Sequence, residues 1–114
     1  MRSRPAELSC ATLAGDVVVN RDSDELGTVR HVMIDVASGR VAYAVLGFGG
    51  VFGIGEALLP IPWSALSHDA DRDALVLDIA RERLERAPRF DAEELSCLAD
   101  PSRAQAIADF YGVA

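Results

Sequence analysis

Short apolar runs separated by polar turns fill the first two thirds of the chain. β-Branched or alternating segments occupy residues 16–20, 28–35, 40–48, 56–61 and 74–79, and turn residues separate them at hairpin-like intervals. Strands of this length and spacing are typical of small all-β domains. We therefore predict five or six short strands that form a small antiparallel barrel.

The segment 40–48 (RVAYAVLGF) is apolar at odd and even positions alike. Because successive side chains of a strand point to opposite faces, this pattern predicts burial on both faces. One face would pack on the barrel core. The other face needs a cover, which either a helix of the same chain or another subunit could supply.

The last third of the chain carries helix signals. Residues 80–88 (ARERLERAP) predict a short helical segment that must end before Pro88. Asp91 begins a capping-box pattern, and Asp100 and Gly112 are placed to begin and end a longer helix. Strands first and helices last predict an α+β chain. We expect a flexible N-terminal tail over 1–8, a barrel domain over 9–90 and a helical segment over 91–114 that packs on the barrel or on a partner.

Five glycines within nine positions of the stretch 47–60 (GFGGVFGIGEALLP) raise the question of a phosphate-binding loop. Neither the glycine spacing of a dinucleotide fingerprint nor the Gly-Lys-Ser/Thr of a P-loop is present. Both motifs also require a helix after the glycines, and Pro60 and Pro62 exclude one there. We interpret the stretch as a sharply bent connection between two strands.

Composition narrows the class of function. The 114 residues fit one domain, and the net charge of −7 disfavours phosphate backbones and anionic membranes. No run approaches the roughly 20 apolar residues of a membrane helix. We therefore expect no nucleic-acid partner, no membrane insertion and a cytoplasmic location. Cys10 and Cys97 lack a metal-ligand spacing and are expected to be free thiols, although they could pair if the terminal segments meet.

The polar residues do not assemble into a recognisable catalytic or metal site. Asp69, Asp71 and Asp73 match the opening of a calcium loop, but Ala74 and Ala80 stand where the loop needs Gly and Glu. We therefore expect no enzymatic activity, no cofactor and no metal. The alternative is a small-ligand or metal-binding regulator that uses the acidic turns 22–25 and 69–73.

An ordered set of short motifs resembles the PRC-barrel family. These motifs are residues 13–17 (LAGDV), 26–29 (LGTV), 34–40 (IDVASGR), 41–45 (VAYAV), 49–56 (GGVFGIGE), 62–66 (PWSAL) and 84–88 (LERAP). The resemblance covers roughly residues 12–90 and implies a small β-barrel that serves in docking or assembly and not in catalysis. The stand-alone bacterial members fit best. The reaction-centre H subunit has a membrane helix and the 16S ribosomal RNA maturation factor has a separate N-terminal barrel, and the sequence resembles neither of these segments, so we expect neither of these two specific roles.

Apolar residues around the glycine bend predict an interface. Phe48, Val51, Phe52 and Ile54 lie on this bend and Glu56 closes it. An exposed apolar cluster on a small protein commonly marks an interaction site. We predict a self-associating protein-interaction or assembly module, a homodimer or higher homo-oligomer, whose further protein partner the sequence does not identify.

Overall fold

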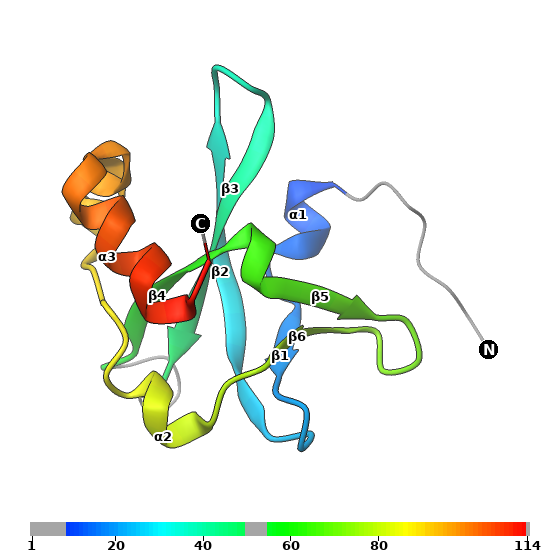
Figure 1. Ribbon diagram of the computed structural model, residues 1–114. Coiled ribbons are helices and arrows are strands. Elements are labelled where there is room, and N and C mark those ends of the chain that lie inside the picture. Colours follow the sequence, from blue (N-terminus) through cyan, green and yellow to red (C-terminus); the bar gives the residue numbers. More distant parts are fainter. Residues whose placement is uncertain (1–8, 50–54, 114) are drawn as a thin grey trace.

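Six strands form one curled sheet in the computed structural model, which describes residues 9–49 and 55–113 (Figure 1). Their order in the sheet is β4-β3-β2-β1-β6-β5. The strands are β1 (Val17–Val19), β2 (Glu25–Asp35), β3 (Arg40–Phe48), β4 (Ala57–Pro62), β5 (Leu66–Asp69) and β6 (Ala74–Leu77). The predicted small barrel followed by helices is confirmed. Neighbouring strands are antiparallel except β1 and β6, whose parallel pairing makes the sheet mixed.

The helices are α1 (Cys10–Leu13), η1 (Trp63–Ala65), α2 (Arg81–Leu84), η2 (Ala92–Ala99) and α3 (Pro101–Tyr111). Those of the last third, α2, η2 and α3, lie where the sequence signals predict them, whereas α1 and η1 are not predicted. A carboxylate oxygen of Asp100 accepts a hydrogen bond of 2.9 Å from the Ser102 amide, and Gly112 ends α3 with a φ of 70°. The Glu94 carboxylate likewise accepts the Asp91 amide at 3.0 Å. The segment that follows Asp91, η2, has the tighter 3₁₀ geometry.

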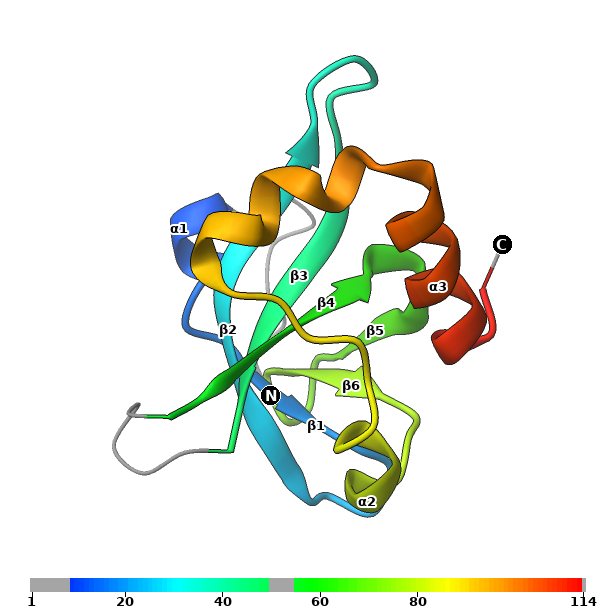
Figure 2. The ribbon, with the colours of Figure 1, turned by 90° about the vertical axis from the view of Figure 1, so that its left-hand side faces the viewer.

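Strand β3 is covered on both faces over its second half, as its apolar pattern predicts. One face, through Ala44, Leu46 and Phe48, joins the barrel core; the other, through Val45, packs against Phe90, Leu95, Leu98 and Ile107. Figure 2 shows η2 and α3 lying across this second face. The cover is therefore supplied by helices of the same chain.

Strand β2 begins at Glu25, three residues earlier than predicted. The side-chain oxygen of the buried Asn20 accepts hydrogen bonds of 3.0 Å from the amides of both Asp22 and Asp24. Ser23 completes this tight turn with a φ of 68°. Because the turn closes within residues 20–24, Glu25 is free to pair with Val19.

Strands β2 and β3 continue beyond the rest of the sheet. Strand β1 pairs with β2 only as far as Thr28, and β4 pairs with β3 only from Tyr43 onward. Residues 33–42 therefore form a two-stranded projecting hairpin, visible at the top of Figure 1. Its turn follows the prediction, because Asp35 accepts the Ala37 amide at 3.0 Å and Gly39 has a φ of 74°.

Candidate functional site

The glycine bend predicted as an interface is described only at its two ends. Val51, Phe52 and Ile54 lie outside the described residues, so an interface at the bend stays a prediction. At one end, Phe48 is only 8% exposed, and the Arg81 guanidinium lies 5.5 Å from the centre of its ring. Phe48 is thus a core residue of its own chain.

At the other end of the bend, Glu56 forms a two-point ion pair with Arg30 of β2. The two nitrogen–oxygen distances are 2.9 and 3.0 Å, and hydrogen bonding to Glu56 raises the pKa of Arg30 above its ordinary value. A Cβ atom at Gly47 would collide with the Glu56 carboxylate, so the glycine leaves room for the pair to cross β3. Glu56 therefore ties the start of β4 to β2. The sequence analysis placed Glu56 at the predicted interface and did not identify Arg30 as its partner.

The acidic turn between β5 and β6 is stabilised by hydrogen bonds and an ion pair among its own residues. One carboxylate oxygen of Asp69 accepts the amides of Asp71 and Arg72 at 3.0 and 3.3 Å, and the other lies 3.1 Å from the Arg72 guanidinium. Within residues 9–49 and 55–113, no group of three or more His, Cys, Asp or Glu residues could hold a metal ion. The side chains of Cys10 and Cys97 lie outside the described part of the chain.

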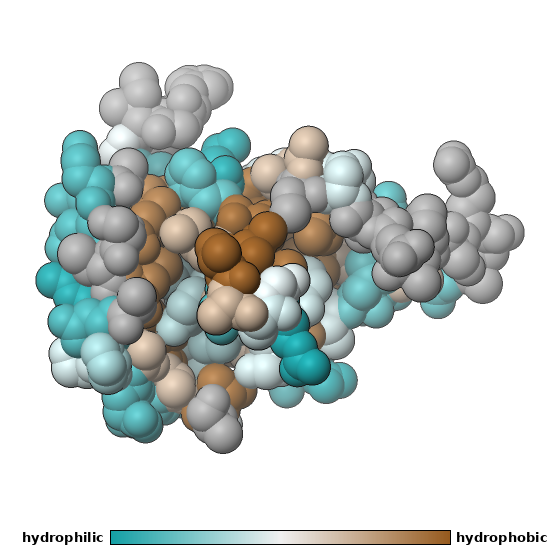
Figure 3. Space-filling model, turned by 90° about the horizontal axis from the view of Figure 1, so that it is seen from above, coloured by the Kyte–Doolittle hydropathy of each residue, from teal (hydrophilic) through white to brown (hydrophobic). Residues whose placement is uncertain are grey.

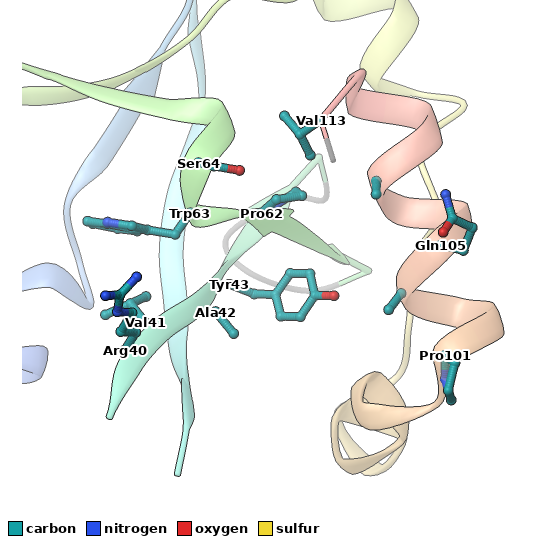
Figure 4. Close-up of a pocket in the computed structure, with 12 residues that line it drawn as sticks. Arg40, Val41, Ala42, Tyr43, Pro62, Trp63, Ser64, Pro101, Gln105 and Val113 are labelled. Atoms are coloured by element: carbon teal, nitrogen blue, oxygen red, sulfur yellow. The ribbon is translucent and has the colours of Figure 1, made fainter. Parts of the chain in front are cut away.

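A groove of about 820 Å³ runs between the start of β3 and helix α3 (Figure 4). In this view the Tyr43 ring points toward α3, while Trp63 lies on the far side beside Arg40 and Val41. Burial raises the pKa of the Tyr43 hydroxyl, which remains a neutral hydrogen-bond donor at neutral pH. The groove is lined by Arg40, Val41, Ala42, Tyr43, Pro62, Trp63, Ser64, Pro101, Ala104, Gln105, Ala108 and Val113.

The groove exists because of two features of its walls. Strand β4 ends at Pro62 and the chain turns away through η1, so residues 40–42 of β3 have no strand beside them on this side. The opposite wall, α3, presents the small side chains of Ala104 and Ala108. Short side chains on one wall and a missing strand on the other leave the space open.

Apolar side chains extend from the groove onto the projecting hairpin. Ile34 is 47% exposed and Val36 is 90% exposed. A second hollow of about 490 Å³, which shares Ala42 and Tyr43 with the groove, reaches this hairpin. Figure 3 views the molecule from the side on which the hairpin projects and shows apolar side chains gathered near the middle. We call Ile34, Val36, Ala42, Tyr43 and Trp63 together the hairpin surface.

Arg40 lies at the edge of the hairpin surface, and its positive charge has no ion-pair partner among the described residues. Among the described residues its guanidinium has no ion pair or hydrogen bond, in contrast to Arg30, Arg72 and Arg103, which each hold a carboxylate. The apolar pattern of 40–48 gave no sign that its first half would lie outside the cover. The turn signals at residues 35–40 were the available clue, since they place Arg40 beside a hairpin tip.

Two findings concern the chain as a whole: whether one of its helices could cross a membrane, and which known proteins it is similar to. Among the described residues, no helix combines the length and apolar character needed to cross a membrane. No curated protein matches the sequence. Thirty-five chains of solved structure match, among them a candidate 16S ribosomal RNA processing protein RimM from Pseudomonas aeruginosa. The two sequences are 21% identical and the two structures superpose with a TM-score of 0.41. The match covers 72% of this chain and 49% of the RimM chain, so this chain spans about half the length of that protein.

The family is shown by the match of this chain to a family model. The family model described as the PRC-barrel domain matches residues 5–84, which is well over half of the sequence and includes all six strands. The chain therefore belongs to the PRC-barrel domain family.

Proposed function

We propose that the protein is a non-catalytic interaction module that self-associates through the hairpin surface. The observation that carries this proposal is the exposure of Ile34 and Val36 on a hairpin that borders an apolar groove. Full burial of a side chain of this size is worth about 1.5–3 kcal/mol. Because Val36 is almost fully exposed and Ile34 is about half exposed beside an open groove, burying them against another molecule would be favourable.

Two further facts support an interaction role. Membership of the PRC-barrel family supports a protein-interaction or assembly module at a general level. The pKa values that depart from their ordinary range in the described residues belong to structural contacts and not to a reactive cluster. They are those of Arg30 in its ion pair, Glu94 and Asp100 at helix starts, and the partly buried phenols of Tyr43 and Tyr111.

Light scattering over the micromolar range tests self-association. We expect a mass of at least twice that of the chain at the upper concentrations, and a return to the monomer on dilution. Val36→Asp should lower the association because it places a charge in the contact. Ser67→Asp, which adds the same charge on the exposed edge strand β5, is the matched control. A wild-type protein that stays monomeric throughout would overturn the proposal.

A further inference from the structure

The hairpin tip and the groove have complementary chemistry on the same molecule. The tip presents Ile34, Asp35 and Val36 in sequence, that is, a carboxylate between two exposed apolar side chains. The groove presents apolar walls with a single cation, Arg40, at its edge. A second copy of the chain therefore carries a segment with the features that the groove would accept.

Within residues 9–49 and 55–113, neither the Asp35 carboxylate at the tip nor the Arg40 guanidinium at the groove has an ion-pair partner. Asp35 and Arg40 are partners in the β2–β3 register, yet the described contacts contain no ion pair between them. One oxygen of Asp35 accepts the Ala37 amide, which leaves the other oxygen for a further donor. Among the described residues the Arg40 guanidinium has no ion pair or hydrogen bond, and Arg40 is one of the residues that line the groove. An arginine in this state favours a carboxylate from outside.

We propose that two copies form a two-fold symmetric dimer in which each hairpin tip enters the groove of the other copy. In this arrangement Asp35 of one copy pairs with the partner's Arg40, and the same contact occurs a second time by symmetry. Ile34 and Val36 then leave water for the apolar walls of the partner's groove. This inference rests on the proposed self-association and specifies its geometry.

The two-fold arrangement follows from the positions of the two surfaces. The tip and the groove lie side by side on one hairpin, since residues 40–42 are both its second strand and a wall of the groove. A copy turned by 180° can therefore offer its tip while receiving one. The contact closes on itself, so the assembly stops at two copies and does not grow into a filament.

A charge exchange provides the test. Asp35→Arg and Arg40→Asp each place like charges at both contacts, and we expect each variant to weaken dimerisation at least about tenfold in sedimentation velocity. An equal mixture of the two variants should form a mixed dimer. In that dimer the arginine placed at position 35 faces the aspartate placed at position 40, and the native Asp35 faces the native Arg40. The double variant should dimerise with itself for the same reason.

Two controls separate pairing from folding. The melting temperature of each variant, measured by circular dichroism, reports whether the hairpin change has disturbed the barrel. Because Asp35 also accepts the Ala37 amide, Asp35→Asn keeps that acceptor, removes the charge and should still weaken the dimer. If Asp35→Arg does not fold, Asp35→Asn and Arg40→Asp decide the matter alone.

The outcomes distinguish this geometry from self-association in general. A wild-type monomer at every concentration overturns both proposals. A wild-type dimer that both single variants leave unchanged overturns the tip-in-groove geometry and leaves self-association standing. Single variants that are monomeric alone and remain so when mixed also overturn the pairing of Asp35 with Arg40. Recovery of a dimer on mixing supports it, because no contact within one chain can be restored that way.

Discussion

The two halves of strand β3 have similar side chains and different surroundings. Residues 44–48 are buried throughout, with Val45 and Leu46 fully out of water between the barrel core and the C-terminal helices. Residues 40–43 continue the same apolar pattern, but Arg40 is exposed and the next three are only half-buried. The change occurs between Tyr43 and Ala44, next to the point where β4 ends its pairing with β3 at Pro62.

This comparison shows what an apolar pattern can establish. Alternation of side chains predicts that a surface will be covered, but it does not say by which chain. In the second half of β3 the cover comes from the same molecule. In the first half the described residues leave the surface open, and we propose that another copy covers it.

Removal of residues 91–114 should have the largest effect. This deletion exposes Val45 and its neighbours on the second face of β3, together with the groove wall, so the barrel should lose its cooperative unfolding. Thermal denaturation followed by near-ultraviolet circular dichroism measures this directly. If the truncated chain kept a sharp transition near that of the full chain, the helices would not be the cover that the fold requires.

A pair of truncations compares the covered and open regions one side chain at a time. Leu46→Ala removes a fully buried side chain and should lower the free energy of unfolding by about 2–5 kcal/mol. Val36→Ala, at a side chain 90% exposed, should change it by less than about 0.5 kcal/mol under dilute conditions that favour the monomer. Urea denaturation followed by Trp63 fluorescence gives both values. Equal losses at the two positions would contradict the difference between the regions.

The ion pair at the far end of the covered region should matter less. Glu56 is 14% exposed and Arg30 is 44% exposed, so solvent weakens their attraction. We expect Glu56→Gln to lower the free energy of unfolding by about 0.2–1 kcal/mol. Asp78→Asn, which removes the more exposed pair with Arg21, is the control and should have a smaller effect still. A larger loss of unfolding free energy for Asp78→Asn than for Glu56→Gln would show that burial does not determine which of the two ion pairs stabilises the protein more.

The smallest effect concerns Asp100, the residue that caps the start of α3, and depends on pH. Hydrogen bonds from the Ser102 hydroxyl and amide hold the pKa of Asp100 below its ordinary value of 3.8. A lowered folded-state pKa means that Asp100 stabilises α3 fully above this value, and that the contribution disappears as the pH falls through the folded-state pKa. The difference in melting temperature between wild type and Asp100→Asn should therefore shrink below pH 3.8. A difference that is constant down to strong acid would contradict the assignment.

Local chemistry made much of the fold predictable. The caps at Asp100 and Gly112 and the hairpin turn at residues 35–40 depend on residues close together in sequence. The two-sided burial of the second half of β3 was predictable because the apolar pattern of residues 40–48 signals it, although the residues that cover β3 are distant in sequence. The early start of β2 is the exception, because the polar run 21–27 does not show that the Asn20 side chain closes the turn by accepting the amides of Asp22 and Asp24. Capping and turn residues act over a few positions, so a sequence displays their partners.

The candidate site was less predictable because it depends on distant residues. The groove joins Tyr43 to Ala104 and Ala108, which only the packing of α3 brings together. Glu56 was expected at an interface, and its partner Arg30 lies 26 residues away in sequence. Nothing in the spacing of these residues signals that they meet. The prediction of an interface at the bend remains to be tested beside the hairpin surface.

Hydrogen–deuterium exchange at low and high protein concentration tests the central claim most directly. We predict that peptides covering residues 33–43 become more protected as the concentration rises, because self-association covers the hairpin and the start of β3. Peptides covering residues 44–48 should be equally protected at both concentrations, since helices of the same chain already cover them. Protection that does not depend on concentration anywhere, or that changes only around the glycine bend at 49–56, would contradict self-association through the hairpin surface.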